Sequence, residues 1–385
     1  MLVNPDFLTN PDVAIVLTGL LVGTASSLVG TFLVLRKSSM LADAVSHSIL
    51  LGIILVFLIT KNQYSPFFIL GAAAAGVLTV ALTELLASSK RVKDDAAIGL
   101  VYPFLFAIAV LLINLYARDV HIDVDAVLLG EIGFVWIDTT QLFGVDIPNS
   151  VLTMGAVTLA NLLFVTLFYK ELKLSTFDPG LAAALGFSPV VVYYLLLFLT
   201  SVTAVTAFDA VGSVLLVAFV IVPPAAAYLL TDKLYKMLLF GVLIAALSSF
   251  LGYASAVWLD VSIGGMMASY TGVFLVLAFL FGPRYGLFAQ EFRRGEQRRR
   301  NAERTLLVHL YNHEDSASSE RENVVSALHT HLRWSEQRAT EVIARGLEQN
   351  LVQKTGSEHL DLTPKGRILA QEVLEPWREV GSAGD

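Results

Sequence analysis

Long apolar runs fill the first three-quarters of the chain, and a short polar segment separates each run from the next. About 20 apolar residues suffice for a helix to cross the hydrocarbon core of a membrane. Each run therefore predicts one membrane-spanning helix, nine in all. For the run at 189–207 and the start of the next, which Phe208–Asp209 interrupts, a broken or re-entrant helix is the alternative. The runs lie at about 14–35, 41–60, 66–87, 96–117, 149–169, 189–207, 211–230, 236–258 and 262–282.

Lysine and arginine fall mainly on alternate loops, as the positive-inside rule requires of a multi-pass protein of the plasma (inner) membrane. The other loops receive only Lys61 and Arg118 in this comparison. The pattern predicts an amino terminus outside and a carboxyl terminus in the cytoplasm. The predicted cytoplasmic positions are Arg36 and Lys37, Lys90, Arg91 and Lys93, Lys170 and Lys173, Lys233 and Lys236, and Arg284 with the cluster at 293–300.

Composition agrees with a membrane protein and excludes two kinds of chemistry. Hydrophobic residues make up 55% of the chain and charged residues 15%, with a mean hydropathy of +0.68, whereas soluble domains carry roughly 25% charge. Cysteine is absent, which excludes disulfides and thiolate metal sites. The sequence also contains no Gly-x-x-x-x-Gly-Lys-Ser/Thr loop to bind nucleotide phosphates. We therefore expect a transport subunit that is not itself an enzyme, with any ATP hydrolysed by a partner.

Asp43 and His47 are the candidate metal ligands. They lie one helical turn apart inside the second apolar run, so both project from one face of the helix. Ionisable residues in a membrane span are costly and mark ion or substrate paths. A carboxylate and a neutral imidazole suit Mn²⁺, Fe²⁺ and Zn²⁺, of which we expect Mn²⁺ first. The alternatives are a helix cap for Asp43 and a hydrogen bond to a carbonyl for His47.

A short helix with sharp ends is predicted between the fifth and sixth runs. Thr176 or Asp178 can cap it, Pro179 suits its first turn, and Gly186 suits its end. It would lie in the cytoplasm, where a minimal connection needs no such helix. The alternative is an ordinary loop with one helical turn.

Several motifs, in this order and spacing over roughly residues 10–288, resemble the permeases of manganese, zinc and iron ABC importers. Gly264–Gly265 departs from that pattern, because relatives usually have a Pro–Ser/Thr–Gly turn before the last span. The matching segments are Arg36–His47, Asp95–Gly99, Asp125–Gly130, Phe177–Gly186 and Val211–Ala227.

The resemblance implies a dimer of permease subunits, as a homodimer or a paralogous heterodimer, with no bound cofactor of its own. It also implies two cytoplasmic ATPase subunits and an extracytoplasmic metal-binding receptor protein. Asp43 and His47 match positions that line the metal path, so two copies would bring up to four ligands to one ion. Phe177, Asp178, Ala182 and Gly186 match the coupling helix that contacts the ATPase.

The composition becomes polar and charged beyond residue 286, which predicts a change of domain. We expect an all-α polytopic permease domain over 1–288, a basic juxtamembrane linker that contacts lipid headgroups over 289–301, and a small α+β cytoplasmic domain over 302–385. The last domain is predicted as helices at 305–311, 323–332 and 335–348, with Ser335 as a cap, a hairpin at 351–354 and 359–362, and a helix after Pro364. This order resembles the winged helix-turn-helix of the DtxR and MntR metal-dependent repressors.

We interpret the carboxyl-terminal domain as a regulatory or protein-interaction module, with DNA binding as the less favoured alternative. Residues 305–385 hold eight Lys/Arg and more Asp/Glu, whereas phosphate binding needs a basic face. The pairs His309/His313 and His329/His331 are interpreted as surface or packing residues. Two other functions stay open: an ion-gradient-driven transporter, which leaves the short cytoplasmic helix unexplained, and a membrane-tethered or released DNA-binding regulator, which leaves the spans unexplained.

Overall fold

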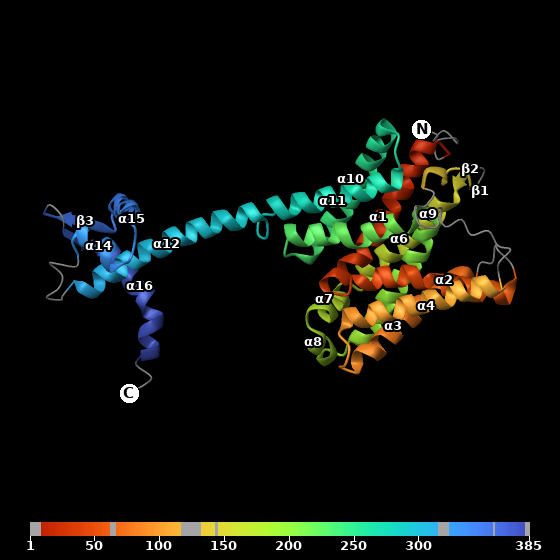
Figure 1. Ribbon diagram of the computed structural model, residues 1–385, viewed down its shortest axis with the longest axis horizontal. Helices are drawn as coiled ribbons and strands as arrows, with labels where there is room; N and C mark the ends of the chain where they lie inside the picture. Colours follow the sequence, from red (N-terminus) through yellow and green to blue (C-terminus); the bar gives the residue numbers. More distant parts are fainter. Residues whose placement is uncertain are drawn as a thin grey trace. The chain divides into compact units, whose positions relative to one another are not determined.

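The computed structural model describes residues 9–61, 67–116, 132–142, 145–314, 323–356 and 359–381 (Figure 1). The chain forms two compact units, Met1–Leu287 and Phe288–Asp385.

In the part of the chain that the structure describes, eight helices of the first unit are long and apolar enough to cross a membrane. Between them lie the 3-10 turn η1 (Ile132–Phe134), the antiparallel strands β1 (Thr139–Leu142) and β2 (Val145–Pro148), and the short helices α7 (Tyr169–Phe177) and α8 (Pro179–Ala184). The eight are α1 (Pro11–Leu35), α2 (Met40–Thr60), α3 (Phe68–Ser88), α4 (Asp94–Tyr116), α6 (Asn149–Leu167), α9 (Pro189–Leu230), α10 (Leu234–Leu259) and α11 (Ile263–Phe281).

The predicted runs at 189–207 and 211–230 form α9 (Pro189–Leu230), in which two helices meet at a kink with no loop between them. Its helical geometry breaks at Gly212, with φ 76° and ψ 175°, not at Phe208–Asp209. Only glycine adopts this backbone conformation readily, because it has no Cβ. With helical residues on both sides, the chain turns without a polar loop.

Contacts along α1 show that α9 doubles back at this break. Near the start of α9, the Tyr193 ring lies 5.0 Å from the guanidinium of Arg36, just after α1. Thr203 lies level with Ala25, since both bind the side chain of Asn161. Val220, beyond the break, packs against Gly30, closer to the end of α1 again. The two halves of α9 therefore run in opposite directions, and Figure 1 shows the change of direction.

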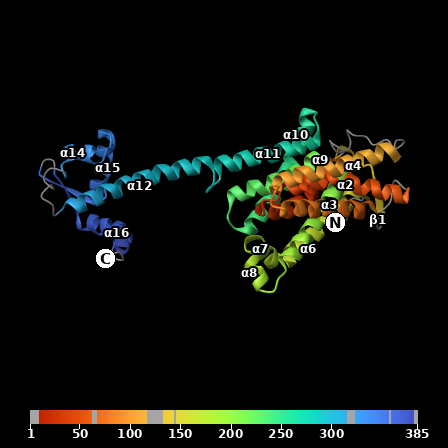
Figure 2. The same cartoon turned by 60° about the horizontal axis from the view of Figure 1, so that its bottom comes forward.

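Helix α1 lies at the centre of the first unit, Met1–Leu287, which we call the membrane unit. Its apolar stretch is the most buried of the eight, with 67% of its most apolar window inside the protein. It packs against α6, α9 and α10, and small residues such as Gly23 and Gly30 allow its backbone to approach these neighbours closely. Helices α2, α3 and α4 form a second group side by side (Figures 1 and 2).

Several buried polar side chains in the membrane unit have backbone or side-chain partners, as an apolar solvent favours, whereas the hydroxyls of Ser26, Ser27 and Ser201 have none among the described residues. Asn161 of α6 donates to the carbonyl of Ala25 at 3.2 Å and to the hydroxyl of Thr203 at 2.8 Å, which ties three helices together. Buried threonines such as Thr31 and Thr79 donate to the carbonyl one turn earlier, each at 2.8 Å. These bonds let the polar residues sit inside the bundle.

The second unit has its own apolar core, which includes Leu306, Leu328, Val342 and Leu360. It comprises α12 (Leu287–His313), α14 (Val325–His331), α15 (Glu336–Glu348), the antiparallel strands β3 (Val352–Thr355) and β4 (His359–Leu362), and α16 (Pro364–Gly381). α14, α15, the hairpin and α16 lie close to where the sequence predicts them, whereas the predicted linker at 289–301 and the helix at 305–311 form the single helix α12. Ser335 caps α15 by accepting a hydrogen bond from the Arg338 backbone at 3.3 Å.

Replacing Gly30 by alanine should destabilise the membrane unit by about 1–3 kcal/mol, because the new Cβ would overlap the backbone carbonyl of Val220. Gly155→Ala is the matched control, since its Cβ would meet no atom within 4 Å, and alanine is the better helix former there. The thermal midpoint of the detergent-purified protein measures both. Equal midpoints for the two variants would contradict the close α1–α9 contact.

Candidate functional site

Asp43 and His47 lie together near the start of α2. The Nε2 atom of His47 is 3.4 Å from Oδ1 of Asp43, and the two side chains are 35% and 32% exposed. They are the fourth and eighth residues of α2, which places them about 5 and 11 Å along the helix from its first residue. A carboxylate and an imidazole are thus presented side by side, partly open, near one end of the bundle.

Cap geometry argues against a purely structural role for Asp43. The cap position of α2 belongs to Ser39, whose side chain makes no capping hydrogen bond. Asp43 lies four residues further on, where its own carbonyl accepts a hydrogen bond from the Ser46 hydroxyl at 2.7 Å. Its carboxylate instead faces His47.

Two aromatic rings of α4 hold the imidazole of His47. The Tyr102 ring is stacked on it at 5.7 Å between centroids and 24° between planes. The Phe106 ring meets it edge-on at 6.3 Å and 80°. Sequence reasoning missed both residues, although their spacing of four places them on one helix face. The rings restrict how the imidazole can turn while its Nε2 atom lies beside Oδ1 of Asp43.

Asp43 and His47 form a pair and not a larger cluster of candidate metal ligands in the part of the chain that the structure describes. Among the described residues, no group of three or more His, Asp or Glu side chains is placed to hold an ion. Divalent transition metals bind four or more ligands. Asp43 and His47, as two side chains, are fewer than such a set of ligands. The Asp125–Gly130 motif lies outside the described residues.

The predicted short helix is α8, and Asp178 is its cap. The carboxylate of Asp178 accepts a hydrogen bond from the backbone of Leu181 at 2.9 Å, with Pro179 in the first turn. Gly186 follows the helix with φ 86°, the left-handed conformation that favours glycine. The sequence therefore located both ends of this segment.

Side chains of the α7–α8 segment divide into an inner and an outer set. Ala182 is fully buried and packs the helix against its own unit. Phe177, Leu181 and Leu185 are 60%, 46% and 57% exposed, and we call these three apolar side chains the outer edge. The sequence analysis named Phe177 but not Leu181 or Leu185.

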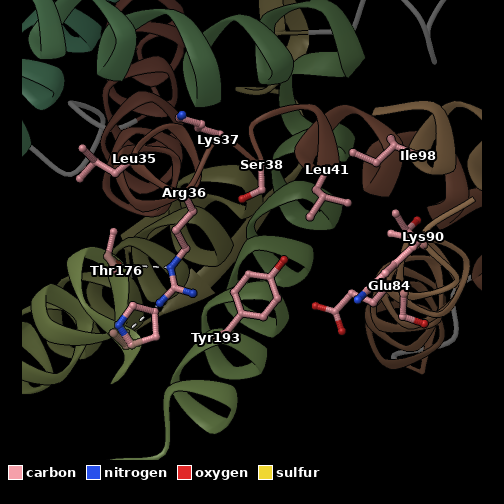
Figure 3. Close-up of a pocket in the computed structure, with 15 residues that line it drawn as sticks. Leu35, Arg36, Lys37, Ser38, Leu41, Glu84, Lys90, Ile98, Thr176 and Tyr193 are labelled. Carbon is pink, nitrogen blue, oxygen red and sulfur yellow. Dashed lines mark hydrogen bonds between the residues drawn. The ribbon is translucent and has the colours of Figure 1, made fainter. Parts of the chain in front are cut away.

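A cavity of about 880 Å³ lies beside this segment (Figure 3). Its walls come from the α1–α2 turn, the end of α3, the start of α4, α7–α8 and the start of α9. It therefore lies between the α7–α8 segment and the beginning of the helix that carries Asp43 and His47.

Known proteins resemble this chain mainly over its membrane unit. The ABC 3 transport family matches residues 12–282. The manganese transport system membrane protein MntD of Bacillus subtilis (strain 168) is 48% identical over 280 residues, which are 72% of this chain and 95% of MntD. PsaBC from Streptococcus pneumoniae in complex with Fab has a similar fold, with a TM-score of 0.59 and 28% identity over 70% of this chain and 91% of that one.

One similarity also covers the second unit. The zinc transport system membrane protein TroD of Treponema pallidum (strain Nichols) is 43% identical over 361 residues, which are 94% of this chain and 98% of TroD. With only 6% of this chain left unmatched, the similarity extends through most of residues 288–385.

Proposed function

The chain belongs to the ABC 3 transport family and is a metal-transport permease, and from this premise we propose that Asp43 and His47 bind the transported ion. The observation that carries the assignment is their 3.4 Å approach near the start of a membrane-spanning helix, with both side chains partly open. Ionisable side chains in a span are retained where they serve an ion path. The permease moves a divalent transition metal into the cytoplasm.

Manganese is the first choice for the transported metal. MntD, nearly half identical to this chain, is a manganese system protein, whereas TroD is a zinc system protein. Carboxylate and imidazole ligands suit Mn²⁺, Fe²⁺ and Zn²⁺ alike. Selection among them then falls largely to the receptor protein that delivers the ion from outside.

Two permease subunits complete the metal site. Each copy contributes one carboxylate and one imidazole, so a dimer offers four ligands where one chain offers two. The partner is a second copy of this chain or a paralogous subunit. The partly open faces of Asp43 and His47 are consistent with this arrangement, because ligands shared between subunits must be accessible from outside their own chain.

The outer edge of α7–α8 docks on a separate ATPase subunit. The chain has no phosphate-binding loop of its own, and Phe177, Leu181 and Leu185 expose apolar surface beyond the ends of the spans. Aromatic and aliphatic side chains that enter a pocket of a partner carry much of an interface's binding energy. Asp178 and Gly186 define the shape of the segment, and Ala182 anchors it.

The membrane orientation follows from the basic loops and from α9. Because α9 doubles back, both of its ends lie on the same side, and Lys170, Lys173, Lys233 and Lys236 all fall on that side. The positive-inside rule places this side in the cytoplasm. The amino terminus is then outside, and residues 288–385 lie in the cytoplasm.

The second unit regulates transport and does not recognise DNA. In α15, Arg338 lies 5.6 Å from the Trp334 ring, and Arg345 lies 3.8 Å from Glu303 and 4.0 Å from Glu341. Both arginines of α15 thus already have partners within the unit. A winged-helix fold is still our expectation for this unit, with a partner protein or an effector in place of DNA.

Replacing either metal ligand should reduce metal uptake strongly. For Asp43→Asn and His47→Gln we expect a loss of more than about 10-fold, since even partners of metal ligands contribute 10–100-fold. Ser48→Ala is the control, because its buried hydroxyl only donates to the Val45 carbonyl at 3.0 Å. Uptake is measured in vesicles that contain or lack the ATPase, with membrane insertion checked in parallel. Wild-type uptake in both ligand variants would disprove the site.

Loss of the outer edge should weaken the ATPase contact. Phe177→Ala should lower the affinity for the ATPase by about tenfold or more, a change of ~1.4 kcal/mol. Phe279→Ala, which removes a similarly exposed ring from α11, should leave it unchanged. Retention of the ATPase on the purified permease reports the difference. An equal effect of both variants would argue against docking at α7–α8.

Truncation after Arg300 should leave uptake in place with an altered rate or an altered response to cytoplasmic metal. The cut removes the second unit's core while keeping every span and the metal pair. Uptake by the truncated permease, at matched membrane amounts, measures this. Tight, sequence-dependent binding of a 301–385 fragment to DNA at physiological salt would instead make the chain a transporter fused to a repressor.

A further inference from the structure

Arg36 joins the end of α1 to the α7–α8 segment. Its Nε atom donates to the hydroxyl of Thr176 at 3.2 Å, and its second terminal nitrogen donates to the hydroxyl of Ser175 at 2.9 Å. The guanidinium carbon lies 5.0 Å from the centre of the Tyr193 ring. Figure 3 shows the Arg36 side chain reaching from the α1–α2 turn toward Thr176, beside the Tyr193 ring.

The groups that contact the positively charged guanidinium of Arg36 are neutral. Arg36 is half-buried, and burial lowers the pKa of its guanidinium below the usual value. Within the described residues, no carboxylate lies at ion-pair distance from it. The Ser175 hydroxyl donates to the Leu172 carbonyl at 3.3 Å and so keeps its lone pairs for Arg36. The end of α1, the last turn of α7 and the start of α9 therefore meet at the Arg36 cation, and none of these contacts neutralises its charge.

The turn that carries Arg36 is short and internally bonded. Only residues 36–39 separate α1 from α2. The backbone N–H of Ser38 donates to Leu33 at 2.9 Å, and that of Leu41 donates to Ser38 at 3.0 Å. Lys37 has the left-handed φ of 58°. A displacement of Arg36 is therefore passed to the first turn of α2, which ends at Asp43.

At the other end, Arg36 is bound just before the outer edge. Ser175 and Thr176 are in the last turn of α7, directly followed by Phe177 and the cap Asp178. Arg36, Ser175 and Thr176 themselves line the 880 Å³ cavity, together with Glu84 and Lys90 across it. The hydrogen-bonded junction therefore borders open space.

We propose that Arg36 is a positioning residue that transmits movement of the α7–α8 segment to α2, and so sets the positions of Asp43 and His47 during transport. It deepens the function proposed above, on which it rests. When an ATPase moves the segment, the forked hydrogen bonds of Arg36 carry the displacement to the α1–α2 turn. Without these hydrogen bonds, the ATPase still hydrolyses ATP, but Asp43 and His47 do not move with the α7–α8 segment.

The test compares metal transported with ATP hydrolysed. The full permease is reconstituted in liposomes with its ATPase and receptor, with Mn²⁺ as the probe. For Arg36→Gln we expect uptake to fall about tenfold while ATP hydrolysis stays within about twofold of wild type, since the hydrogen bonds lost involve a charged donor. Lys37→Gln, which removes a positive charge from the exposed neighbouring position, should keep the wild-type ratio.

The acceptor side provides an independent variant. Ser175→Ala combined with Thr176→Val removes both hydroxyl acceptors and leaves Arg36 intact. If the Arg36→Gln permease does not assemble with its partners, this double variant tests the role of Arg36 in its place. We expect the same fall in the ratio of metal transported to ATP hydrolysed, with no further fall when Arg36→Gln is added. An unchanged ratio, or uptake and hydrolysis that fall in equal proportion, would overturn the transmission role. A wild-type complex without ATP-dependent uptake would instead refute the proposed function.

Discussion

A charged side chain is stable in a membrane protein only where another group pairs with it or forms hydrogen bonds to it, and this constraint applies to the functional groups of the membrane unit. Asp43 and His47 satisfy it through each other, at 3.4 Å and near the start of α2. An ionisable group at the centre of a span costs roughly 2.5–3.5 kcal/mol on insertion scales, and the cost decreases toward the ends. The pair therefore lies where it can be partly open to an ion while still paired. Tyr102 and Phe106 then fix the imidazole from the side of α4.

The same helix bundle links this pair to the proposed ATPase contact through α1. Its tight packing at Gly30 leaves little room for α1 to bend against α9, and closely packed interiors transmit displacements instead of absorbing them. Arg36 directly follows the last residue of α1, and its hydrogen bonds reach the last turn of α7. The short turn to α2 then brings the path to Asp43. Rigid packing and one forked side chain thus connect two regions that are far apart in the sequence.

Apolar periodicity and cap chemistry predicted most of the elements, because both act over a few residues. Asp178, Gly186 and Ser335 stand at helix ends as the sequence indicates. The sequence marked the interruption of α9 at Phe208–Asp209, whereas the structure breaks the helix three residues later, at Gly212, where no polar loop marks the turn. The Asp43–His47 contact followed from their spacing of four. The Tyr102 and Phe106 rings depend on how α2 packs against α4, which spacing along one helix does not specify.

On the proposed function, a site divided between two subunits solves the central difficulty of metal transport, which is release. Binding must be strong enough for the ion to enter and weak enough for it to leave. Two ligands on one chain bind a divalent ion weakly, and four bind it well, so a small separation of the subunits lowers the affinity without breaking any bond within a chain. Nitrogen and oxygen ligands bind Zn²⁺ more tightly than Mn²⁺. Such a path therefore releases manganese more readily than zinc, and exclusion of zinc falls to the receptor and to the rate of release.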